Sequence, residues 1–154
     1  MTTVDTYDLI CSLGGNCAIA YNLRYRNMRY FSLPFDWTYI KDEKPIEFLT
    51  YCFKGEKNFK DIALKSNLEL VEVDKKNDGH RDKIKYRDNL SKFYFFNHFT
   101  EPIEMGGVYD NFKKTFDKRI DRMLELIEKS SKILFILSTS FDFELSYFYN
   151  LFYT

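Results

Sequence analysis

Long hydrophobic runs are absent from this sequence of 154 residues. A helix that spans a bilayer needs roughly 20 consecutive apolar residues, and no segment approaches that length, so we expect no membrane partner. An excess of charge of either sign is also lacking, because 23 basic and 23 acidic side chains give a formal net charge of zero. Without a positive field we expect no nucleic-acid partner either. The chain must therefore select its partners by local chemistry.

Cysteine and histidine are scarce, with three and two residues respectively. Three cysteines cannot all pair within the chain, and no secretory leader pattern precedes them, which predicts a reducing, cytoplasmic location. There is no Cys-x-x-Cys or His-x-x-x-His pair at zinc spacing and no glycine-rich phosphate-binding loop. We therefore expect neither a metal ion nor a cofactor.

The pattern of apolar residues predicts a single α/β domain over residues 1–154. Short continuous apolar runs are typical of buried strands, and they occur at residues 7–13, 94–99 and 133–137. Alternating residues also predict a strand with an irregularity over 68–73. A polar stretch over 74–82 is typical of a solvated turn.

Helices are predicted where apolar residues recur at steps of three and four, over 17–27, 109–129 and 144–151, and from Pro45 to near Gly55. Helices that alternate with strands favour a mostly parallel sheet flanked by helices. The sequence ends within the last helical pattern, so we expect a domain truncated at its C-terminus.

One cysteine follows a predicted turn from strand to helix. Gly14 and Gly15 can adopt the positive φ that such a turn requires, and Asn16 is a typical N-cap residue. Cys17 would then lie at the positive end of the helix dipole, which favours a thiolate over a thiol. Cys17 is therefore a candidate nucleophile, with its backbone amide and the Asn16 side-chain amide as candidate donors to an oxyanion. The alternative is a small apolar cysteine buried under the sheet.

A cysteine nucleophile needs a base, and imidazole is the usual one. His98 is the candidate base because it stands among aromatic residues near the end of a predicted strand, whereas His80 lies in the polar turn. The alternative for His98 is a core histidine that bonds to a backbone carbonyl. Asp36 or Asn97 is the candidate group that orients the imidazole. The alternatives for Asp36 are a capping role or an ion pair with an arginine at position 24, 26 or 29.

Two arginines share one face of the helix predicted over 109–129. Arg119 and Arg122 are three residues apart, a spacing that brings side chains together on a helix. They either clamp an anion or form surface ion pairs with Glu125 or Asp121, and such pairs contribute little to stability.

Two segments of the chain together resemble a known family. Ser12-Leu-Gly-Gly-Asn-Cys17 and Ser32-Leu-Pro-Phe-Asp-Trp37 are similar to the opening signature of a bacterial family of uncharacterised proteins, described as "putative papain-like cysteine peptidases". Phe96-Asn-His98 is similar to a later segment of that family. The chain departs from the pattern at Phe99, where the family tends to carry an acidic residue, and at Leu137, where it often carries arginine. The resemblance implies Cys17 as nucleophile and His98 as its base.

The leading hypothesis is a cysteine-dependent hydrolase of the papain-like peptidase type, which forms an acyl thioester on Cys17. Its substrate is a small molecule or a peptide of unknown identity, and the oligomeric state stays open. The alternative is a non-catalytic α/β binding or interaction module that holds a small ligand in a crevice at the Gly14–Cys17 turn. In that case Cys17 only fills space.

Overall fold

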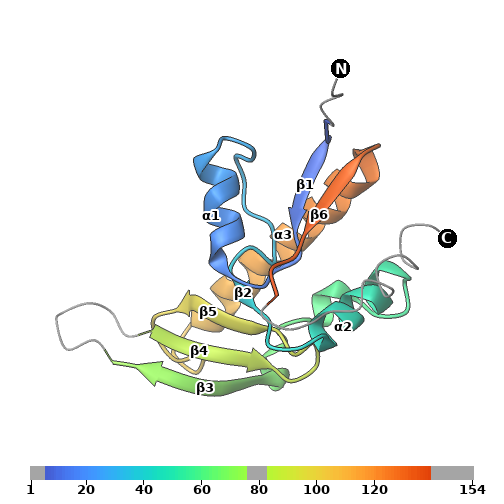
Figure 1. Ribbon diagram of the computed structural model, residues 1–154. Coiled ribbons are helices and arrows are strands. Elements are labelled where there is room, and N and C mark those ends of the chain that lie inside the picture. Colours follow the sequence, from blue (N-terminus) through green and yellow to red (C-terminus); the bar gives the residue numbers. More distant parts are fainter. Residues whose placement is uncertain (1–5, 76–82, 140–154) are drawn as a thin grey trace.

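The computed structural model describes residues 6–75 and 83–139 of the chain (Figure 1). Two short 3-10 helices lie between α2 and β3, at Phe59–Asp61 and Lys65–Asn67. The other elements, in chain order, are β1 (Leu9–Ser12), α1 (Cys17–Tyr25), β2 (Thr38–Tyr39), α2 (Lys44–Phe53), β3 (Leu68–Asp74), β4 (Lys83–Asp88), β5 (Tyr94–Phe99), α3 (Val108–Lys129) and β6 (Ile133–Ile136). The class is mixed α/β, as predicted.

The strands form two sheets, and most of their pairing is antiparallel. β1 and β6 make a parallel pair, while β2, β5, β4 and β3 form a four-stranded antiparallel sheet in that order. The prediction of a mostly parallel sheet is therefore wrong. The reason lies in the connections: β3, β4 and β5 follow one another after only a few residues, and a parallel neighbour needs a crossover of a dozen residues or more.

The turn after β1 joins the two sheets. Gly14 and Gly15 have φ of +100° and +116°, which confirms the predicted glycine turn. Gly15 forms an isolated parallel bridge with Tyr39 of β2, and β2 pairs with β5. The start of α1 is therefore attached, through β2, to the strand that carries His98.

Aromatic rings fill the core between the antiparallel sheet and α3. Figure 1 shows α3 extending from β5 towards the β1–β6 pair. Phe116 of α3 contacts Phe35 and Phe95 at ring-centroid distances of 6.2 and 5.6 Å, in edge-on geometry. Ile120 and Met123 continue the same buried face of the helix. Burial of these apolar side chains stabilises the fold.

Two predicted features lie outside the described residues, namely the helix over 144–151 and the turn that contains His80. Of the helices that the structure describes, none is long and apolar enough to cross a membrane. The predicted irregularity of the 68–73 strand is confirmed as a shift in register between Leu70 and Glu72.

Candidate functional site

Cys17 is the first residue of α1 and its side chain is exposed. Asn16 caps the helix, because its side-chain oxygen accepts a hydrogen bond from the backbone N–H of Ala18 at 2.9 Å. Cys11 and Cys52 are buried instead, and burial raises the pKa of both thiols to about 12. A thiol with that pKa is inert at neutral pH. Cys17 is therefore the thiol that solvent and substrates can reach.

Both polar atoms of the Asn16 side chain form hydrogen bonds. Its amide nitrogen donates to Ser138 Oγ at 2.8 Å, and the backbone N–H of Ser138 donates to the Gly14 carbonyl at 3.3 Å. A side-chain amide carries two N–H donors, so one remains for a ligand. A cavity of about 290 Å³ lies beside this turn, and its lining includes Asn16, Ile19, Asn22, Ile136 and Ser138.

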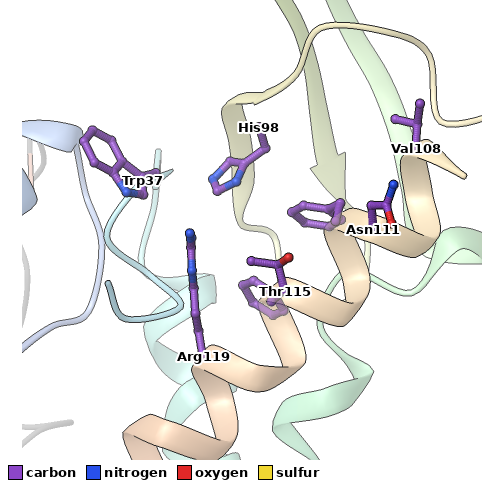
Figure 2. Close-up of a pocket in the computed structure, with 8 residues that line it drawn as sticks. Trp37, His98, Val108, Asn111, Thr115 and Arg119 are labelled. Carbon is purple, nitrogen blue, oxygen red and sulfur yellow. The ribbon is translucent and has the colours of Figure 1, made fainter. Parts of the chain in front are cut away.

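His98 lines a separate cavity of about 550 Å³, between β5, α3 and the loop that carries Trp37 (Figure 2). Its Nε2 atom is buried and has no hydrogen-bond partner among the described residues. Burial lowers the pKa of His98 to about 4, and the nearby positive charge of Arg119 acts in the same direction, while a hydrogen bond to the Trp37 backbone opposes both. At neutral pH the imidazole is therefore uncharged.

The Trp37 backbone also decides which imidazole nitrogen carries the proton. A hydrogen bond that raises the pKa of His98 stabilises its protonated form, so the imidazole donates and the Trp37 carbonyl accepts. Because Nε2 has no partner in the described structure, we assign the donor role to Nδ1. Nε2 of the neutral ring is then an acceptor with a free lone pair. A general base must be unprotonated, as this nitrogen is, but a pKa of about 4 makes it a weaker base than an ordinary imidazole.

Asp36 lies in a buried ion pair with Arg29. Both carboxylate oxygens accept from the guanidinium, at 2.7 and 2.6 Å, and one also accepts from the backbone N–H of Leu33 at 2.7 Å. Burial raises the pKa of the Asp36 carboxyl, and the hydrogen bonds from Arg29 and Leu33 oppose that rise. The arginine alternative for Asp36 is thus the one seen, and Asp36 fixes the loop whose next residue, Trp37, contacts the imidazole. The side chain of Asn97, the other candidate orienting group, lies outside what the structure describes.

The structure brings Asn16 and Cys17 together but gives His98 other neighbours. Among the described residues, no hydrogen bond links Cys17 to His98, and neither Cys17 nor Asn16 lines the His98 cavity. Trp37 lies between the two regions. It lines the His98 cavity and also a second cavity of about 130 Å³, which Ala20 of α1 lines as well. Ala20 lies one turn after Cys17 on the same helix face.

Three polar residues of α3 also line the His98 cavity: Asn111, Thr115 and Arg119. Asn111 and Thr115 were not predicted from the sequence. A signal exists, because the three follow one another at steps of four and form a polar row beside the apolar face of the helix. Within residues 6–75 and 83–139, no group of three or more His, Cys, Asp or Glu side chains is placed to hold a metal ion.

Lowering the pH is expected to destabilise the fold through His98. Its pKa is about 4 in the folded protein against the ordinary 6.5, so the unfolded chain binds the proton more tightly. The contribution is fully present above pH 6.5 and is lost as the pH falls towards 4, in total about 3 kcal/mol. Urea denaturation between pH 7 and 4.5 measures this. A His98→Gln variant should lose less stability over that range, and equal losses would contradict the prediction.

Comparison with known proteins adds a family and one relative. The model of a family described as "Putative papain-like cysteine peptidase" matches residues 8–145. An uncharacterized protein of Acanthamoeba polyphaga mimivirus is 30% identical over 139 residues. The match covers 83% of this chain and 60% of the relative, so the chain spans less than two thirds of the relative's length. No solved structure matches the chain. The family is the one predicted from the sequence, although this relative is viral and a bacterial origin stays a prediction.

Proposed function

The chain belongs to the family described as "Putative papain-like cysteine peptidase", and on that premise we propose that it is a cysteine-dependent hydrolase with Cys17 as nucleophile and His98 as base. The observation that carries the proposal is the contrast among the three thiols. Cys17 is exposed at the first position of a capped helix, while Cys11 and Cys52 are buried and have pKa values of about 12. A nucleophilic thiol needs access and a stabilised thiolate, and the helix N-terminus provides the second.

In the proposed reaction, Nε2 of His98 takes the proton of the Cys17 thiol and the thiolate attacks a carbonyl carbon. The Cys17 backbone N–H and the remaining N–H of the Asn16 side chain stabilise the oxyanion. The imidazolium then protonates the leaving group, and water hydrolyses the acyl thioester. Sγ and Nε2 must come within about 3 to 4 Å for the first step. Trp37 lines both the His98 cavity and the cavity beside Ala20 of α1. We therefore expect its indole to move when substrate binds, so that Cys17 and His98 can approach each other.

Asp36 serves as a positioning residue in this scheme. Its carboxylate is occupied by Arg29 and Leu33, and it acts on His98 through the backbone of the following residue, Trp37. An exposed nucleophilic thiol also requires a reducing compartment, so we propose a cytoplasmic location. The substrate is a peptide or a small acyl compound.

A non-catalytic binding module is the second candidate. The observation that favours it is the cavity of about 290 Å³ beside the Gly14–Cys17 turn, which is lined by Asn16 and Ser138 and does not need the thiol. A ligand held there would use the free N–H of Asn16. Under this alternative, replacing Cys17 with serine leaves ligand binding unchanged.

Alkylation by iodoacetamide across pH separates the two candidates. We expect the rate for Cys17, measured by peptide mass spectrometry, to rise with pH through a midpoint that depends on His98. Replacing His98 with glutamine should move the midpoint to higher pH, because the Cys17 thiol loses its proton acceptor. His80→Gln is the matched control and should leave the midpoint unchanged.

The hydrolase proposal fails if His98→Gln and His80→Gln leave the same alkylation midpoint for Cys17. Exposure alone makes Cys17 react faster than the buried thiols, so the position of the midpoint decides the question and the rate does not. Such a result would favour the binding module.

A further inference from the structure

The His98 cavity is lined by one cationic side chain, Arg119. Arg119 is half-buried, and its guanidinium makes no ion pair or hydrogen bond with the described residues. Burial lowers the pKa of this guanidinium, the negative charge of Asp36 opposes that fall, and the positive charges of Arg122 and Arg29 add to it. The acidic side chains that it might have used pair elsewhere: Asp36 with Arg29, Asp121 with Lys60, and Glu125 with Lys129.

Two polar groups converge on the same space. Figure 2 shows the Arg119 guanidinium pointing from α3 towards the gap between Trp37 and His98. Nε2 of His98 is buried there without a described partner. The remaining walls combine apolar side chains with two neutral polar ones: Trp37, Val108, Phe112, Phe116, Asn111 and Thr115. A cavity of about 550 Å³ lies in the size range of sites for small ligands.

We propose that this cavity binds the C-terminal residue of a peptide, which makes the enzyme a carboxypeptidase with a preference for apolar C-terminal residues. This inference rests on the proposed function, since Cys17 performs the chemistry. Arg119 binds the terminal carboxylate, for which the planar guanidinium offers two parallel N–H donors. The side chain of the terminal residue packs against Trp37 and Phe112. The nitrogen of the last peptide bond then lies beside His98 Nε2.

The charge of the cavity favours a carboxylate over a phosphate group. Because His98 is neutral at pH 7, Arg119 contributes one positive charge and the imidazole none. A carboxylate carries one negative charge and matches it, whereas a phosphate monoester carries between one and a half and two. The second charge would have no cationic partner among the lining residues.

This placement also fits the direction of proton transfer. The Cys17 thiolate attacks the carbonyl carbon of the last peptide bond, and the imidazolium of His98 delivers the thiol proton to the nitrogen as the C–N bond breaks. The free amino acid leaves from the cavity, and water hydrolyses the acyl thioester to regenerate the thiol. The His98 cavity and the crevice beside Asn16 share no lining residue, so the leaving amino acid and the oxyanion occupy different spaces.

The single tryptophan of the chain is Trp37, so its fluorescence reports on the cavity directly. The titration uses the Cys17→Ala variant, which binds without turnover, and two probes: acetyl-Ala-Ala-Phe and its C-terminal amide. We expect a saturable fluorescence change with the free acid and at least tenfold weaker binding of the amide. Arg119→Gln should weaken binding of the acid at least tenfold. Arg122→Gln, on the same helix but outside the cavity lining, should change it less than twofold.

Three outcomes would overturn the assignment. They are equal binding of the acid and the amide, equal binding by the Arg119→Gln and Arg122→Gln variants, and full displacement of the acid by an equal concentration of inorganic phosphate. The comparison of acid with amide needs no Arg119 variant, so it decides the question even if that variant does not fold.

Release of phenylalanine from acetyl-Ala-Ala-Phe by the unaltered protein, followed by mass spectrometry, tests the chemistry separately. Carboxylate-selective binding without release of phenylalanine would support the cavity assignment and contradict the hydrolase proposal. Hydrolysis of internal peptide bonds without carboxylate-selective binding would support the hydrolase proposal and contradict the cavity assignment.

Discussion

Replacing Asp36 with alanine is expected to lower the free energy of unfolding by about 3 to 5 kcal/mol. Asp36 is fully buried and Arg29 nearly so, and the variant would leave the guanidinium buried without its two charge-assisted hydrogen bonds. It would also remove the acceptor of the Leu33 N–H. Losses of this size are typical when one partner of a buried ion pair is deleted. Urea denaturation at pH 7, followed by circular dichroism, measures the change.

Two further variants show whether the loss comes from the unpaired charge. A double variant, Arg29→Met with Asp36→Leu, removes both charges and should regain much of the lost stability, because burying an ion pair is itself costly. Glu125→Gln breaks an exposed pair with Lys129 and should have little effect. If Asp36→Ala costs less than about 1 kcal/mol, the pair behaves as a surface pair and our account of the loop is wrong.

The Asp36 result bears on the site as well as on stability. Asp36 precedes Trp37, whose carbonyl accepts from His98 and whose indole lines the His98 cavity. A loop that loses its ion pair would therefore release the imidazole from its fixed tautomer.

Local rules predicted most elements, but not how the strands pair. The helix over 109–129 was predicted to within one residue of α3, because its apolar period is long and regular. Strand β4 was not predicted. Its sequence, Lys-Ile-Lys-Tyr-Arg-Asp, places charged side chains at alternate positions and buries Ile84 and Tyr86. That alternation is the signal of a half-buried strand, and recognising it would have indicated an antiparallel sheet.

In the candidate site too, features that depend on local sequence were predicted and features that depend on tertiary packing were not. The exposure of Cys17 and the capping role of Asn16 follow from a glycine turn that precedes a helix, which is local information. The partner of Asp36 depended on which of three nearby arginines the loop folds towards, and only tertiary packing decides that. Arg119 was expected to clamp an anion or to pair with Glu125 or Asp121. It stays without a described partner, while Asp121 pairs with Lys60 and Glu125 pairs with Lys129 of the same helix.

Replacing Gly15 with alanine is expected to destabilise the protein by about 3 kcal/mol or more. Its φ of +116° is one that residues with a Cβ rarely adopt. The added Cβ would also lie 1.9 Å from the backbone oxygen of Ser138, so either the start of α1 or the segment after β6 must move. Backbone strain alone costs about 1 to 3 kcal/mol, and the collision adds to it. Urea denaturation measures the total.

Two other glycines separate strain from collision. Gly55 has a φ of +76° but open space where a Cβ would lie, so Gly55→Ala should show strain alone and cost about 1 to 2 kcal/mol. Gly106 has neither feature, and Gly106→Ala should be close to neutral. Because Gly15 also fixes the start of α1, its variant should change the alkylation profile of Cys17, whereas the other two should not. Equal effects from Gly15→Ala and Gly55→Ala would show that the contact with Ser138 does not constrain the turn.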